Sequence, residues 1–203
     1  MAVKVAVIYY SATGTTYGLA RGIEAGAQEA GAEVRFRKVH ELAPEAAIAS
    51  NEGWAAHRLE AKDVAEATLD DLTWADAIIF GTPTRYGLPT AQLKQFIDTT
   101  GPLWATGQLV NKIVSSFTSA ATLHGGQETT IVALNNTFYH WGAIIVSPGY
   151  ADPIQFQAGN PYGTSFASNN GQLKPDETAL AAARFQGRRV AQIAAQFLAG
   201  RKE

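Results

Sequence analysis

The 203-residue sequence contains no cysteine. This absence excludes disulfides, thiolate metal ligands and thiol-based redox chemistry. Neither sign of charge is in excess, because 16 basic residues stand against 18 acidic ones for a net charge of -2. No strong field would therefore draw nucleic acid or an anionic membrane to the surface. No apolar stretch approaches the roughly 20 residues that span a bilayer. We expect neither nucleic-acid binding nor a membrane span.

What is present is the composition of an ordinary globular protein, with 46% hydrophobic and 17% charged residues. The length fits one domain over residues 1–203 with a substantial core. The first residues, Met1 to Lys4, run directly into an apolar segment without the pattern of a signal peptide. We expect a cytoplasmic location.

Hydrophobic patterning predicts an α/β fold. Four short apolar runs, at 5–10, 77–80, 113–117 and 143–146, are typical of strands buried on both faces, and the alternating run at 34–39 indicates a strand nearer an edge. Helical patterns occupy 17–30, 88–99, 127–139 and 176–198. This alternation predicts a three-layer α/β sandwich with a parallel sheet. Two segments are additional to this alternation of strands and helices. One is a helical excursion near 41–71, and the other is a Gly- and Asn-rich loop near 150–175.

The first apolar run ends in a hydroxyl-rich turn, Ser11-Ala12-Thr13-Gly14-Thr15-Thr16, where a helix begins. Its hydroxyls and the free N–H groups of the helix form a cradle for a phosphate. No Lys or Arg lies between Lys4 and Arg21, so the cradle suits a bound rather than a reacting phosphate. Neither a GxxxxGK[ST] nor a GxGxxG pattern occurs here. An ordinary N-cap would explain one hydroxyl but not four.

Two further loops follow the strands at 77–80 and 113–117, at the sheet edge where ligands bind in open α/β folds. In the 81–87 loop, Pro83 stiffens the turn, Gly87 permits close approach and Tyr86 can lay an aromatic face on a planar ligand. The small residues of the 119–128 loop leave backbone donors free at a helix start. A phosphate cradle beside two loops that bracket a flat ring matches the requirements of FMN.

These residues resemble the WrbA-type NAD(P)H:quinone oxidoreductases of the flavodoxin-like fold. The matching segments are 9–11, 78–87, 101–107, 125–128 and 160–163. The resemblance implies a five-stranded parallel sheet in the order 2-1-3-4-5, one FMN per subunit, and exchange of two electrons between NAD(P)H and a quinone. It also implies a homotetramer that completes its active sites at subunit contacts.

The resemblance also assigns roles to individual positions. His140 matches a histidine beside the flavin, Trp104 matches a tryptophan bordering the space for nicotinamide and quinone, and Thr13 lies on the wall that contacts NAD(P)H. The cofactor-binding residues expected from the three loops and this match are Ser11, Ala12, Thr13, Gly14, Thr15, Thr16, Pro83, Thr84, Arg85, Tyr86, Gly87, Ser119, Ala120, Ala121, Thr122, Gly125 and His140.

Several side chains have a second interpretation. Arg85 could steady negative charge on the reduced flavin or tie down its loop through a salt bridge. His140 could instead complement a helix C-terminus, and Trp104 could serve a subunit contact. The other histidines, His40, His57 and His124, lack metal-ligand spacing, so we expect them to be solvent-exposed and expect no metal.

The function hypothesis is a ping-pong hydride transfer in which NAD(P)H reduces the flavin, leaves, and is replaced by a quinone. The cofactor carries the chemistry, so no catalytic side chain is assigned. Backbone N–H groups of the 119–126 segment are candidates for stabilising the charge that develops. Two alternatives remain open, a flavodoxin-type carrier of single electrons and a regulatory or binding module.

Overall fold

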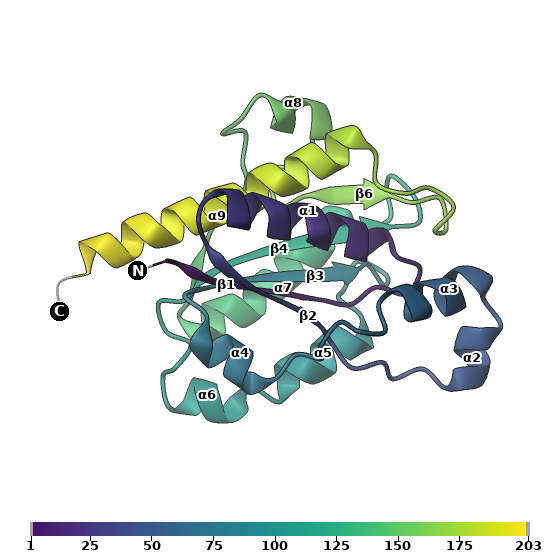
Figure 1. The fold of residues 1–203 in the computed structure, drawn as a ribbon, viewed down its shortest axis with the longest axis horizontal. Helices are drawn as coiled ribbons and strands as arrows, with labels where there is room; N and C mark the ends of the chain where they lie inside the picture. The colour runs from purple at the N-terminus through teal and green to yellow at the C-terminus, as the bar shows by residue number, and fades with distance from the viewer. Residues whose placement is uncertain (1, 202–203) are drawn as a thin grey trace.

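The computed structural model describes residues 2–201 (Figure 1). Its centre is a parallel sheet in the order β2-β1-β3-β4-β5, with β6 also paired to β4. The predicted order 2-1-3-4-5 is confirmed. The strands are β1 (Lys4–Tyr9), β2 (Glu33–Lys38), β3 (Ala77–Pro83), β4 (Ile113–Ala120), β5 (Ile144–Ile145) and β6 (Ser165–Ala167).

Helices cover both faces of the sheet, which gives the three predicted layers. One face carries α1 (Thr15–Glu29) and α9 (Glu177–Gly200). The other carries α4 (Leu69–Trp74), α5 (Ala91–Asp98), α6 (Gly101–Ala105) and α7 (Gln127–Trp141). In Figure 1 the two sets lie above and below the strands, whose carboxyl ends point to the right.

Strand β1 shows why a continuous apolar run forms a central strand. Side chains alternate between faces, so Val5 and Val7 enter the core beneath α1 and α9 while Ala6 and Ile8 enter the opposite core. Strand β2 lies at the sheet edge, as its alternating pattern predicts. Its basic residues Arg35 and Arg37 each reach a carboxylate oxygen of Asp71 at 3.1 Å.

The fifth position of the sheet differs from the prediction of one strand at 143–146. Only the two residues of β5 pair there, next to the start of β4, while β6 pairs with the end of β4 at Thr118–Ala120. The chain leaves the sheet at Pro148, which has no backbone N–H to donate to a ladder. The intervening residues include α8 (Ile154–Ala158). The loop predicted near 150–175 therefore contributes a strand to the sheet.

The excursion after β2 contains α2 (Glu45–Ala49) and α3 (Glu52–Glu60) before α4. Glu41 anchors it to the carboxyl end of β1, because its carboxylate accepts hydrogen bonds from Tyr10 Oη at 2.8 Å, Gln92 Nε2 at 2.8 Å, Trp54 Nε1 at 3.2 Å and the Ala43 N–H at 3.0 Å. Burial alone would raise the pKa of Glu41, but these donors outweigh it and lower the pKa.

Helices α1 and α9 touch through their backbones. A Cβ added to Gly26 would lie 1.8 Å from the carbonyl oxygen of Arg184, and one added to Gly187 would lie 2.0 Å from that of Ile23. Only glycine permits such a crossing. The contact fixes α1, whose first turn is at the hydroxyl-rich loop. Among residues 2–201, no helix has the length and apolar character that crossing a membrane requires.

Candidate cofactor site

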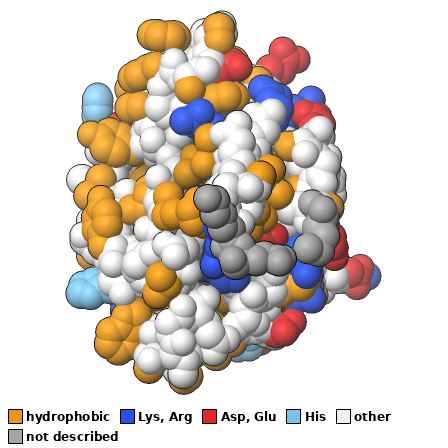
Figure 2. Space-filling view, turned by 90° about the vertical axis from the view of Figure 1, so that its left-hand side faces the viewer, with side chains coloured by type: hydrophobic (Ala, Val, Ile, Leu, Met, Phe, Trp, Pro, Cys, Tyr) orange, Lys and Arg blue, Asp and Glu red, His pale blue; other side chains and the backbone are white. Residues whose placement is uncertain are grey.

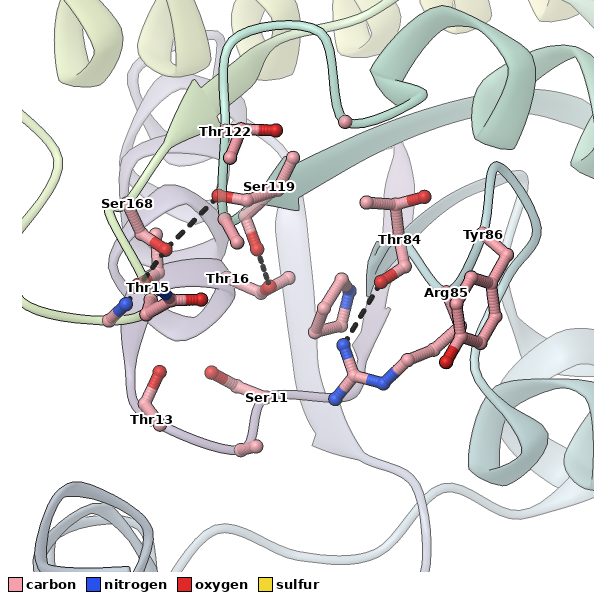
Figure 3. Close-up of a pocket in the computed structure, with 17 residues that line it drawn as sticks. Ser11, Thr13, Thr15, Thr16, Thr84, Arg85, Tyr86, Ser119, Thr122 and Ser168 are labelled. Carbon is pink, nitrogen blue, oxygen red and sulfur yellow. Dashed lines mark hydrogen bonds between the residues drawn. The ribbon is translucent and has the colours of Figure 1, made fainter.

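A pocket of about 620 Å³ lies at the carboxyl edge of the sheet. It brings together the hydroxyl-rich loop after β1, the turn after β3 and the loop after β4 (Figure 3). A fourth segment, which follows β6, completes the lining. The lining residues are Ser11, Ala12, Thr13, Thr15, Thr16, Pro83, Thr84, Arg85, Tyr86, Ser119, Ala120, Ala121, Thr122, Gly125, Ser168, Asn170 and Gly171.

The start of α1 has the features of an anion site. Its N-cap is Gly14, with φ of 90°, so no side chain caps the helix, and no acidic residue lies in the first turn. The first N–H groups are therefore left for an external acceptor. The hydroxyl of Thr15 is buried, has no hydrogen-bond partner within the described chain, and belongs to the pocket wall. An oxyanion such as a phosphate would satisfy both kinds of donor, so the residues present fit the phosphate of FMN.

Neighbouring hydroxyls hold this loop to the adjacent strand. Thr16 Oγ1 and Ser119 Oγ lie 2.8 Å apart, which ties the first turn of α1 to the end of β4. Ser11 Oγ accepts the Gly14 N–H at 3.1 Å and closes the turn. Figure 3 shows these hydroxyl-bearing side chains along one side of the pocket, opposite Arg85 and Tyr86. The loop is thus preorganised by contacts within the chain.

The turn after β3 forms the opposite wall. The Thr84 N–H donates to the Ser119 carbonyl at 2.7 Å, and Thr84 Oγ1 accepts the Gly87 N–H at 3.0 Å. Tyr86 has φ of 55° and is 102% exposed relative to its reference value. A tyrosine in the left-handed region is strained, and the strain is local to the pocket lip. Its ring is left free to lie against a planar ligand.

Arg85 supplies positive charge to this wall. Its guanidinium donates to the Thr84 carbonyl oxygen at 3.0 Å (Figure 3). Among residues 2–201 it takes part in no ion pair. The structure therefore does not support the loop-tying salt bridge, and leaves the charge available to a ligand.

Four of the expected site residues do not line the pocket. Gly14 and Gly87 shape the loops instead: a Cβ on Gly126, where α7 begins, would lie 2.8 Å from Gly87 Cα, so the two turns meet through glycine backbones. His140 and Trp104 lie at the other end of α7, about 21 Å from its start at 1.5 Å per residue. There Trp104 Nε1 donates to the His140 carbonyl at 2.8 Å, and both side chains are exposed.

Ser168, Asn170 and Gly171 also line the pocket and were not predicted from the sequence. The N–H and hydroxyl of Ser168 both donate to the Ala120 carbonyl, at 2.8 and 3.1 Å, which docks this segment beside the loop after β4. Gly171 lies against Thr13, since an added Cβ would meet Thr13 Oγ1 at 2.7 Å. The available signal was the long Gly- and Asn-rich loop near 150–175, of the kind that is often functional.

His57 is also placed differently from the expectation of solvent exposure. It is only 6% exposed, and its ring packs against Tyr17 with centroids 5.1 Å apart. Burial lowers its pKa, an effect opposed by Glu60, whose carboxylate lies 3.0 Å from Nδ1, and reinforced by the positive charges of Lys174 and Lys38. The helical excursion buries this residue against the loop that holds the pocket. His40 and His124 are exposed, as expected.

Comparison with known proteins places this chain in a family. A model described as NADPH-dependent FMN reductase matches residues 3–156. A Deinococcus radiodurans protein named NAD(P)H dehydrogenase (quinone) is 46% identical over 97% of this chain and 98% of its own length. A Geotalea uraniireducens protein of the same name is 44% identical over 95% and 98%.

Solved structures of flavodoxin-type proteins are similar to this chain. The structure of a WrbA-like flavodoxin from Agrobacterium tumefaciens is similar with a TM-score of 0.68 and 27% identity, and covers 96% of this chain and 99% of its own. An archaeal flavodoxin with a TM-score of 0.63 and 19% identity, over 95% of this chain and 99% of its own, shares the fold. The resemblance inferred from the sequence is confirmed, and the chain belongs to the NADPH-dependent FMN reductase family.

Proposed function

We propose that the protein is an FMN-dependent NAD(P)H:quinone oxidoreductase. The observation that carries the proposal is the uncapped start of α1 with the buried, unpartnered Thr15 hydroxyl, which opens into a pocket with an exposed tyrosine on its opposite wall. This combination suits a ligand with a phosphate at one end and a flat ring at the other. The names of the relatives, NAD(P)H dehydrogenase (quinone), support the same reaction.

In this proposal, each of the three sequence-predicted loops contacts a different part of FMN. Residues 11–16 hold the phosphate through N–H groups and hydroxyls. Residues 83–87 lie along the isoalloxazine ring, and residues 119–125 present backbone groups to its polar pyrimidine edge. When bound, FMN supplies the two-electron chemistry that links a nicotinamide to a quinone.

The protein's own contribution is positioning and electrostatics. Arg85 and the backbone N–H groups of the 119–126 segment place positive potential where negative charge develops. Tyr86 and Thr13 border the open side of the pocket and would orient the nicotinamide and then the quinone in the same space. A cytoplasmic location accords with the use of reduced nicotinamides.

We extend the proposal to a homotetramer, because two expected site residues cannot reach the pocket of their own subunit. Trp104 is 55% and Tyr139 68% exposed although both are large and apolar. Such side chains gathered on one surface are typical of an interface. Figure 2 views the end of the molecule where α6 lies in Figure 1, and hydrophobic side chains gather along one side of it. In the assembly, Trp104 and His140 would border the pocket of a neighbouring subunit.

The test begins with the purified protein and its visible spectrum. We expect a flavin that is released by denaturation and identified as FMN. Anaerobic addition of NADH or NADPH should bleach the flavin absorbance, and a soluble quinone should restore it. A protein that neither contains nor binds FMN, or whose flavin is unaffected by either nicotinamide, would overturn the proposal. A stable one-electron radical signal on photoreduction would favour a flavodoxin-type carrier instead.

The oligomer is tested separately. Light scattering on the FMN-loaded protein should give four times the mass of one chain. Trp104→Ala should lower quinone turnover while leaving the FMN content unchanged, because the residue does not line the pocket of its own subunit. A monomeric protein with full quinone turnover would contradict the tetramer without affecting the flavin assignment.

A further inference from the structure

The segment 168–175 passes across the start of α1. Gly171 lies against Thr13, as described above, and Pro175 packs on Gly18, where an added Cβ would meet Pro175 Cγ at 3.2 Å. Between these two contacts, Lys174 Nζ lies 3.4 Å from the position that a Cβ on Gly14 would take. The segment therefore brings a cation to a loop that has none in its own sequence.

Internal bonds fix the shape of this segment. Asn169, Asn170 and Gly171 are consecutive residues with φ of 48, 55 and 84°. Their left-handed turn is held by the Gly171 N–H donating to Ser168 Oγ at 3.0 Å and the Leu173 N–H donating to the Ser168 carbonyl at 2.9 Å. Asparagine and glycine tolerate this conformation better than other residues do. The position of Lys174 thus follows from a defined turn.

The positive charge of Lys174 affects the pKa of a residue beside this loop. It is one of the positive charges that lower the pKa of buried His57, although burial of the ring is the larger cause. Gly14 is in contact range of both side chains, because an added Cβ would also lie 3.3 Å from His57 Nδ1. Burial lowers the pKa of His57 and so disfavours its charged form, whereas Lys174 places a positive charge next to Gly14.

We propose that Lys174 is a specificity residue that favours FMN over riboflavin by placing positive charge behind the phosphate-binding loop. The inference rests on the proposed function, since it requires the FMN phosphate at the start of α1. A glycine at position 14 lets the ammonium group approach the loop, and hydroxyls and N–H groups make the direct contacts on the inner side. Lys174 then adds the charge that these neutral donors lack.

The test compares two ligands that differ only in the phosphate. FMN and riboflavin are each titrated into the apo forms of the wild type, Lys174→Gln and Lys174→Arg. We expect K174Q to bind FMN about tenfold more weakly at low salt, with riboflavin affinity unchanged, and K174R to retain most of the preference. The loss should shrink as salt is added.

Lys94→Gln is the matched control, because it removes the same charge from an exposed position on α5, on the other face of the sheet. It should leave both affinities unchanged. Unaltered FMN binding by K174Q, or equal losses for FMN and riboflavin, would overturn the role of Lys174. Failure of the wild type to bind either flavin would instead overturn the proposed function.

Discussion

Thr15→Val should make the apoprotein more stable and the cofactor complex weaker. The hydroxyl of Thr15 is buried without a partner in the described chain. An unsatisfied buried polar group costs about 1–3 kcal/mol, and valine has nearly the same shape without that group. We therefore expect the free energy of unfolding of the apoprotein to rise by about 1 kcal/mol, which is a Tm increase of roughly 3 °C for a chain of this size.

The effect on FMN has the opposite sign. A hydrogen bond to a charged phosphate oxygen is worth about 1.5–3 kcal/mol, so its loss corresponds to a Kd roughly 10- to 150-fold weaker. Urea unfolding of the apoprotein measures the first quantity and quenching of FMN fluorescence the second. Thr15→Ser, which keeps a hydroxyl, should bind FMN nearly as well as the wild type. An apoprotein destabilised by T15V, or unchanged FMN affinity, would refute the reasoning.

Three further predictions concern the scaffold around the site. Because the pKa of Glu41 is lowered in the fold, its carboxylate contributes stability above about pH 4.5 that is lost as the pH falls through the folded pKa, and Glu41→Gln should flatten this dependence in urea midpoints. Because the pKa of His57 is lowered, the unfolded chain binds its proton first, so stability should fall as the pH drops below about 6.5 in the wild type but not in His57→Phe. Gly187→Ala, whose new Cβ would lie 2.0 Å from the Ile23 carbonyl, should destabilise the protein by about 3 kcal/mol and weaken FMN binding, whereas Gly200→Ala, which meets nothing within 4 Å, should do neither. A pH profile of either variant that matches the wild type, or equal urea midpoints for the two alanine variants, would count against the corresponding contact.

The features that the sequence predicts correctly are local. Strand β1 and the hydroxyl-rich loop are adjacent in the chain, so a buried run followed by four hydroxyls is visible without tertiary information. The turns after β3 and β4 could be assigned to the same edge because parallel strands end together. Within these loops, Gly14 and Gly87 are not among the residues that line the pocket, and both shape its backbone.

The features that it misses depend on distant contacts. Ser168 reaches the pocket only because β6 pairs with β4, and a three-residue strand has no hydrophobic period to detect. Burial of His57 depends on how the short helix α3 docks onto α1, which the sequence of α3 does not indicate. The remoteness of His140 could have been foreseen, because a helix beginning at the pocket carries its last turn to the opposite edge.

The glycine crossing of α1 and α9 joins an early part of the chain to one of its last elements. The ribosome makes the hydroxyl-rich loop first and α9 among the last elements, yet the tilt of the helix that begins at that loop depends on Gly187 meeting Ile23. A nascent chain that still lacks α9 already contains the pocket wall at Ser168–Gly171 but has no brace on α1. We therefore expect flavin loading to follow the synthesis of α9, and a chain truncated before Gly187 to retain no FMN.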